Sequence, residues 1–120
     1  MPVQRRKHLR LPLESTTFIE MPSPRLSQRT TERMITCKTL DVSRGGLQVI
    51  LAEELMVGAI LQINIEMPGA AEGELHIAGE VRWCLQNKDA QYPWIAGFQL
   101  LNAENTDVDQ WIALITLMEN

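Results

Sequence analysis

The stretch that decides the fold is ELHIAGEVRWCLQ, residues 74–86, in which apolar and polar side chains alternate. One set is Leu75, Ile77, Gly79, Val81, Trp83 and Leu85, and the other is Glu74, His76, Ala78, Glu80, Arg82, Cys84 and Gln86. Successive strand residues point to opposite faces, so this period of two predicts a β-strand with one buried and one solvated face. Such strands are typical of antiparallel sheets and barrels.

The same alternation occurs in AILQINIEM (59–67), and PGAAEG (68–73) supplies turn residues between the two segments. Apolar and β-branched composition predicts further strands, at 16–21, 34–42, 46–52 and 92–101. The period then changes near the C-terminus, where the apolar residues Val108, Trp111, Ile112, Ile115 and Met118 recur at helical spacing. We also expect Thr106 and Asp109 to cap this helix. The pattern predicts a mainly β chain, a six-stranded antiparallel β-barrel covered at its end or side by a C-terminal α-helix.

A chain of 120 residues with 45% hydrophobic and 22% charged residues fits one globular domain. We expect a flexible basic arm over 1–13, a barrel over 14–103 and a helix over 104–120. Pro12 favours an extended conformation for the residue before it, which argues against a helix in the arm. Only 5% of the residues are aromatic, so aliphatic side chains must fill most of the core.

Charge is unevenly distributed along the chain. Residues 1–33 hold seven Lys/Arg and three Asp/Glu, a net +4, whereas residues 34–120 hold four and twelve, a net −8. An acidic body without a row of exposed aromatic residues disfavours nucleic acid as a partner. The basic N-terminus still allows a local site for an anion.

Targeting and redox signals are sparse. The start is polar and basic, without the apolar region of a secretory signal, and no apolar run approaches the roughly 20 residues that span a bilayer. Cys37 and Cys84 are too few and too far apart for a disulfide framework or a zinc site. We expect reduced thiols in a cytoplasmic protein that does not insert into a membrane.

Signals of catalysis are weak, so we do not expect an enzyme, a metal or a cofactor. His8 and His76 are isolated histidines with nothing at metal-ligand spacing. Ser43 has no predicted histidine and aspartate partners, and the Gly45-Gly46 pair is not followed by the Lys-Ser/Thr of a phosphate-binding loop.

Two segments favour the binding of an anionic nucleotide. Arg6 and Arg10 have the spacing Arg-x-x-x-Arg, and guanidinium groups fork onto phosphates and stack on bases. This spacing recurs within residues 25–33, so alone it is also consistent with a solvated basic stretch. DVSRGG (41–46) combines a carboxylate and a hydroxyl suited to a guanine edge with glycines that allow positive φ and close backbone approach. The alternative is an Asx-type turn that only reverses the chain.

Together, RRKHLRLPLE (5–14), DVSRGGLQV (41–49), VRW (81–83) and AGFQLL (96–101) resemble the PilZ domain family, bacterial receptors for cyclic di-GMP, over nearly the whole chain. The resemblance implies the ligand-binding residues Arg5, Arg6, Arg10, Asp41, Ser43, Gly46 and Trp83. In that family, the two arginines of the first motif bind phosphates and stack on guanines. The aspartate and serine of the second motif bind a guanine, and its glycine leaves space for the ligand. Arg5 lies just ahead of the first motif, and in having an arginine at this position the chain is similar to family members that bind an intercalated pair of ligands. Trp83 matches a position near a base, although the alternation places it on the buried face and favours core packing.

These features predict a cyclic di-GMP effector whose arm closes over the ligand and forms a surface for a downstream protein partner. We expect a monomer or a ligand-dependent dimer. The alternative is a PilZ-fold interaction module that acts without cyclic di-GMP. Arg25, Arg29 and Arg33 match no family motif, and we expect a solvated loop there.

Overall fold

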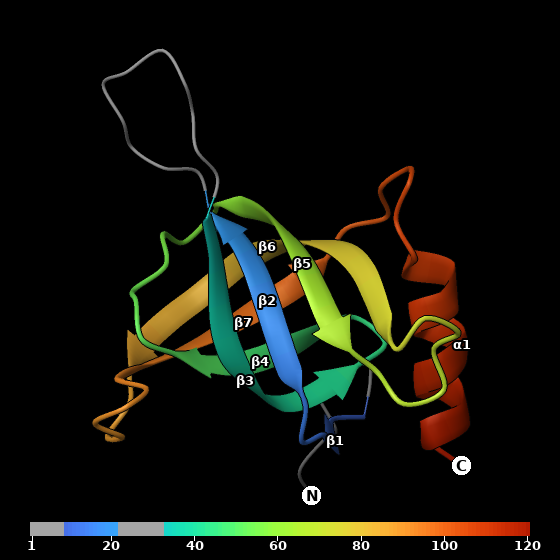
Figure 1. The fold of residues 1–120 in the computed structure, drawn as a ribbon, viewed down its shortest axis with the longest axis horizontal. Helices are drawn as coiled ribbons and strands as arrows, with labels where there is room; N and C mark the ends of the chain where they lie inside the picture. The colour runs from blue at the N-terminus through green and yellow to red at the C-terminus, as the bar shows by residue number, and fades with distance from the viewer. Residues whose placement is uncertain (1–8, 22–32) are drawn as a thin grey trace, which may run out of the picture.

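The computed structural model of the chain describes residues 9–21 and 33–120, which form a closed barrel with a helix at its side (Figure 1). The elements are β1 (Leu11–Pro12), β2 (Thr16–Met21), β3 (Arg33–Ser43), β4 (Gly46–Leu51), β5 (Ile60–Glu66), β6 (Glu74–Gln86), β7 (Trp94–Leu100) and α1 (Val108–Met118). Within these residues, no helix is long and apolar enough to cross a membrane.

Six of these strands close into an antiparallel barrel. The sheet runs in the order β1-β3-β2-β5-β6-β7-β4, and a further ladder between β3 and β4 joins its ends. The two-residue β1 adds to β3 outside the barrel, with Leu11 opposite Val42 and Pro12 opposite Asp41. The predicted fold class is therefore confirmed.

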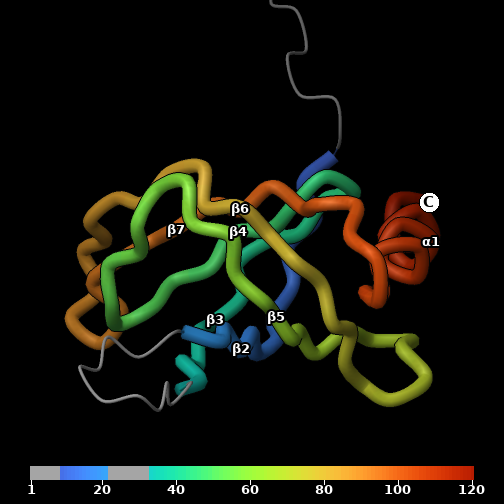
Figure 2. Tube along the Cα trace, turned by 90° about the horizontal axis from the view of Figure 1, so that it is seen from above, coloured from blue at the N-terminus to red at the C-terminus, as the bar shows by residue number. Residues whose placement is uncertain are grey.

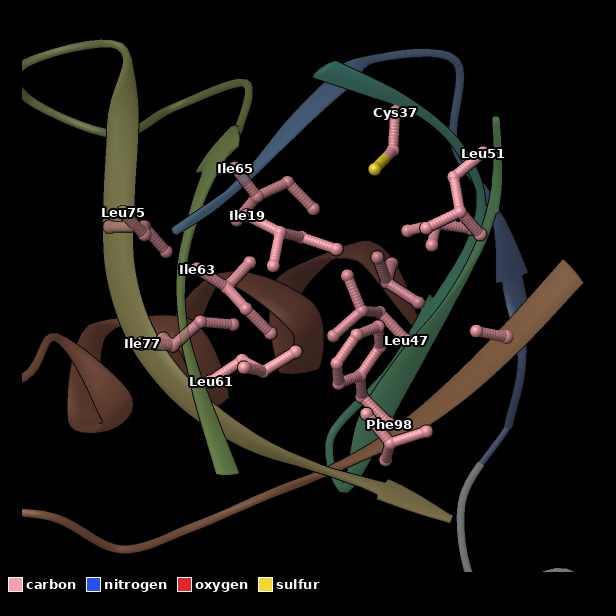
Figure 3. Packing of buried hydrophobic residues seen from close by; sticks show 14 of the residues in the cluster. Ile19, Cys37, Leu47, Leu51, Leu61, Ile63, Ile65, Leu75, Ile77 and Phe98 are labelled. Atoms are coloured by element: carbon pink, nitrogen blue, oxygen red, sulfur yellow. The ribbon is translucent and has the colours of Figure 1, made fainter. Parts of the chain in front are cut away.

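Aliphatic side chains fill the barrel interior, as the composition predicted. Figure 3 shows side chains from the barrel strands meeting inside it, among them Ile19, Ile63, Ile77, Leu47 and Phe98. Ile19 of β2, Ile63 of β5 and Ile77 of β6 are completely buried. The apolar residues of β5 and of the first part of β6 therefore face the interior, as expected.

Two register shifts interrupt the ladders, one in β3 between Thr39 and Asp41 and one in β6 between Val81 and Trp83. A bulge adds one residue to a strand and so reverses the side-chain alternation beyond it. The prediction that Trp83 and Leu85 continue the buried face of β6 was therefore wrong. Leu85 is 61% exposed, while Cys84 turns inward and packs against the core.

Helix α1 lies beside the barrel, as Figure 2 shows from above. Its buried residues are Val108, Trp111 and Ile115, whereas Ile112, predicted in the same apolar stripe, is 42% exposed. The expected cap of Thr106 with Asp109 was wrong, because the N-cap residue is Asp107 and the Thr106 hydroxyl donates to the carbonyl of Ala103.

Four hydrogen bonds tie α1 and its two end residues to the barrel. The Asp107 carboxylate accepts from the backbone N–H of His76 at 2.8 Å, and the Asp107 N–H donates to the His76 carbonyl at 2.7 Å. The indole N–H of Trp111 donates to the Ser43 carbonyl at 2.9 Å. Arg44 Nε pairs with Glu119 at 3.2 Å, so the helix holds the turn that joins β3 to β4.

Replacing Trp111 with Phe tests the link between α1 and that turn. The variant keeps an aromatic ring but leaves the buried Ser43 carbonyl without its donor, which costs about 1–3 kcal/mol of unfolding free energy. Urea denaturation measures this loss. Ile112→Ala, at the exposed neighbouring position, is the control and should change the unfolding free energy by less than about 1 kcal/mol. Equal effects of the two substitutions would contradict the assignment.

Both cysteines are free, and burial raises the pKa of the Cys37 thiol to about 12, with a smaller effect from Glu53. Because the pKa is raised, only roughly one thiol in ten thousand is ionised at pH 8, and the thiolate is the reactive form. We expect iodoacetamide to leave Cys37 unmodified at pH 8 in the folded protein and to alkylate it in urea, as read by peptide mass analysis. Rapid alkylation without urea would contradict the buried placement.

Candidate functional site

The side chains of Asp41 and Ser43 lie on the outer face of the barrel at the end of β3. Val42 between them is completely buried in the core, so its two neighbours must point outward. Asp41 pairs with Gln48 across the β3–β4 ladder, and Ser43 pairs with Gly46. Asp41 is partly exposed, and Ser43 is only 6% exposed. The structure thus places both residues on one surface, as their spacing predicted.

Arg10 lies against this surface. Its Nη1 donates to Asp41 Oδ1 at 2.7 Å, and the side chains of Arg10 and Asp41 are 29% and 23% exposed. The amide oxygen of Gln48, in the orientation that satisfies its hydrogen bonds, accepts from Arg10 Nη1 and Nη2 at 3.1 and 3.2 Å. The Leu13 N–H also donates to the Leu40 carbonyl at 3.1 Å, so the chain just after Arg10 is fixed to β3.

Gly46 allows two strands to approach closely. It lies opposite Gln99 of β7, and a Cβ added to it would collide with the backbone carbonyl of Phe98. The sequence indicated that the glycines of this motif allow both close backbone approach and positive φ; Gly46 makes the close approach and does not have positive φ. Within the described residues the glycines with positive φ are Gly58, Gly69 and Gly73. A side chain at position 46 would therefore disturb the barrel itself.

A row of four residues crosses the outer face from β3 to β6. Asp41 is opposite Gln48, Gln48 is opposite Gly97, and Gly97 is opposite Trp83. The half-buried Trp83 lies outside the core cluster, because the bulge in β6 turns it outward. Its indole ring lies so close over Gly97 that any side chain there would overlap it. The expectation that Trp83 packs in the core was therefore wrong.

Together with Arg10, the row places an arginine, a carboxylate, an amide and an aromatic ring on one continuous surface. Guanidinium groups bind phosphate oxygens, a carboxylate accepts from the N–H groups of a guanine edge, and an aromatic ring stacks on a base. This combination of groups suits a nucleotide. The structure brings together five of the seven residues predicted for the site, which are Arg10, Asp41, Ser43, Gly46 and Trp83.

Most of the other basic residues that the sequence analysis named lie outside the described residues. Arg5 and Arg6 belong to residues 1–8, as does His8, and Arg25 and Arg29 belong to residues 22–32. Arg33 is described at the start of β3, where it forms an ion pair with Glu53 at 2.6 Å. This hydrogen bond raises the pKa of the Arg33 guanidinium and lowers that of the Glu53 carboxyl. Arg33 thus forms its ion pair at a distance of roughly 25 Å from Asp41, measured along β3.

Two residues of the row were missed by reasoning from the sequence. Gln48 is the outward residue of GLQVIL, and an outward glutamine is unremarkable on a solvated strand. Gly97 interrupts WIAGFQL, and a glycine inside a strand does signal close approach of another group. That signal did not reveal which group approaches, because Trp83 becomes its neighbour only through the shifted register of β6 and β7.

A cavity of about 490 Å³ opens elsewhere, and its lining is acidic. Its residues are Glu14, Ser15, Glu66, Met67, Pro68, Glu72, Gly73 and Glu74. Four carboxylates repel a phosphate, so this cavity does not suit an anionic nucleotide. The surface around Asp41, where Arg10 supplies a positive charge, is the better candidate.

Comparison with known proteins gives a family and a fold. The family model described as PilZ domain matches residues 4–117. No curated protein sequence matches the chain at a significant level.

Several solved structures share the fold at low sequence identity. The inhibitor of motility MotI/DgrA of Bacillus subtilis superposes with a TM-score of 0.71 and 18% identity, covering 96% of this chain and 50% of its own. YcgR of Escherichia coli in complex with cyclic di-GMP gives 0.68 and 23%, over 98% of this chain and 47% of its own. The isolated PilZ domain of YcgR with cyclic di-GMP gives 0.66 and 20%, over 97% and 92%. This chain therefore spans about half the length of MotI/DgrA and of YcgR.

Replacing Gly97 with Ala tests the placement of Trp83. The added methyl group would overlap the indole ring, so we expect the ring to move and its side-chain N–H resonance to shift in a two-dimensional NMR spectrum. The corresponding resonances of Trp94 and Trp111 are internal controls and should stay in place. An unchanged Trp83 resonance would show that the ring does not lie on Gly97.

Proposed function

The chain belongs to the PilZ domain family, and we propose from this that it is a receptor for cyclic di-GMP. The observation that carries the proposal is the cluster of Arg10, Asp41 and Gln48 beside Ser43 and Gly46 on one outer face. Two similar structures, both of Escherichia coli YcgR, are complexes with this ligand. Cyclic di-GMP is an intracellular messenger, so the proposed location is the cytoplasm and the proposed role is that of an effector rather than an enzyme.

Arg10 is the proposed phosphate-binding residue among the described ones. Its ion pair with Asp41 and its contact with Gln48 keep the guanidinium close to the surface before any ligand arrives. A guanidinium carries five N–H donors, and these contacts use only part of them. A charge-assisted hydrogen bond to a phosphate contributes about 1.5–3 kcal/mol.

Asp41 and Ser43 are the proposed readers of a guanine. A carboxylate oxygen has two lone pairs, so Asp41 Oδ1 can hold Arg10 and still accept from a guanine N–H. Oδ2 accepts no hydrogen bond from residues 9–21 or 33–120 in the structure. The pair of N–H groups on the guanine edge thus has two acceptors without displacement of Arg10. The Ser43 hydroxyl would add a third contact on the same face.

Trp83 is the proposed stacking platform. One face of its ring lies over Gly97, and the side chain is partly open to solvent. Stacking of a base on an aromatic side chain contributes about 1–3 kcal/mol. The ring lies in the same row as Asp41, three strands further along, so one guanine can reach Asp41 while the other meets Trp83.

The basic arm would complete the site. Arg6 precedes Arg10 by four residues, a span of at most roughly 13 Å of extended chain, and Arg5 precedes it by five. Because the chain after Arg10 is fixed to β3, the arm starts beside Asp41. We propose that the arm closes over the ligand and that the closed arm and barrel together form a surface that a downstream protein binds. The protein would be either a monomer or a dimer that forms when the ligand binds.

Isothermal titration with cyclic di-GMP tests the proposal. We expect binding by the wild-type chain and a roughly ten- to hundredfold higher Kd for Arg10→Ala, the loss of one charge-assisted contact. The matched control is Arg33→Ala, which removes another ion-paired arginine, at the start of β3, and should leave the Kd within twofold. Ser43→Ala should cost less than Arg10→Ala because its hydroxyl is a neutral donor.

The outcomes separate the alternatives. No heat of binding for the wild-type chain at about 100 μM ligand would reject the receptor role and favour an interaction module that acts without cyclic di-GMP. Equal losses for Arg10→Ala and Arg33→Ala would reject the assigned site. A stoichiometry near two ligands per chain would support the role of Arg5 in binding an intercalated pair, and one per chain would count against it.

A further inference from the structure

Arg82 lies at the bulge of β6, next to Trp83. Val81 before it is completely buried in the core, and the ladder to β7 skips Arg82 and resumes at Trp83 opposite Gly97. In a regular strand Arg82 and Trp83 would point to opposite faces. Because of the bulge, Arg82 is exposed while the next residue also points outward.

The Arg82 side chain reaches across the outer face toward the predicted site. Its Nη1 donates to the amide oxygen of Gln99 on β7. Gln99 is the cross-strand neighbour of Gly46, and adjacent strands are about 4.8 Å apart. The guanidinium of Arg82 therefore lies near the glycine of the second motif, on the side of the site away from Arg10.

The charge of Arg82 is not neutralised by a described residue. In residues 9–21 and 33–120 the ion pairs are Arg10–Asp41, Arg33–Glu53 and Arg44–Glu119. Arg82 instead binds a neutral amide through one of its five N–H groups. Glu80 is on the same face two residues earlier, opposite Gln99, but is not within ion-pair distance. The full positive charge and the remaining donors of Arg82 are therefore available to an anion.

We propose that Arg82 is a further ligand-binding residue, which holds the second phosphate of the cyclic dinucleotide; this inference rests on the proposed function. Arg10 lies over Asp41 and Gln48 of β3 and β4, and Arg82 reaches Gln99 of β7, which is one to two strands across the sheet and two residues along it; the two guanidinium groups are therefore roughly 8–12 Å apart. A ligand with two phosphates on opposite edges of one ring fits between two such cations. Guanidinium groups favour this role because they bind phosphate through paired N–H donors.

Titration of the full chain with cyclic di-GMP also tests this inference. Arg82→Ala should raise the Kd about tenfold, and Arg82→Lys should recover part of the loss because a lysine retains the charge but not the fork. Arg33→Ala is again the matched control. In the absence of ligand, thermal unfolding should be the same for Arg82→Ala and the wild type, since the side chain is exposed and bound only to Gln99.

Salt separates an electrostatic role from a structural one. The Debye length falls from about 10 Å at 0.1 M to about 3 Å at 1 M, so the ratio of the Kd of Arg82→Ala to that of the wild type should shrink toward one as salt rises. A Kd for Arg82→Ala within twofold of wild type at 0.1 M salt, with wild-type binding intact, would overturn the role of Arg82 and leave the receptor function standing. Absence of wild-type binding would overturn both.

Discussion

The ladder between β3 and β4 closes the barrel, and the candidate site depends on this closure. The pairing continues to the last possible residues, Ser43 opposite Gly46, directly before the turn. It holds Val42 in the core and Asp41 outside, and it brings Gln48 next to Asp41. An open edge at this position would leave the backbone of β3 free and the two polar side chains without a fixed relation. Closure therefore converts a local motif into a surface of defined geometry.

Elements outside the barrel reinforce the same end of β3. β1 pairs with β3 at Val42 and Asp41, the Leu13 N–H binds the carbonyl of Leu40, and Trp111 of α1 binds the carbonyl of Ser43. The chain on both sides of the barrel sequence is thus attached to four consecutive residues of β3, through the end of the arm on one side and the C-terminal helix on the other. Rigid support of this kind reduces the entropy lost when side chains bind a ligand.

Two bulges determine which side chains face outward. The shift in β3 precedes Asp41, and the shift in β6 precedes Trp83, so the row from Asp41 to Trp83 has a bulge beside each of its ends. Bulges redirect side chains and occur often beside functional sites. The positive charge of the site is also confined to a small surface, although residues 34–120 are acidic as a whole. On this surface Arg10 forms an ion pair with Asp41, whereas Arg82 contacts a neutral amide.

The sequence by itself determined the elements and the second motif, and tertiary structure decided how they meet. β2 and β6 have the predicted bounds, and Asp41 and Ser43 share a face as their spacing required, because alternation along a strand is a local property. The outward turn of Trp83, the inward turn of Cys84 and the contact of Trp83 with Gly97 were not predictable in this way. They follow from a register shift between β6 and β7, and register is set by the pairing of whole strands around a closed barrel rather than by neighbours in the chain.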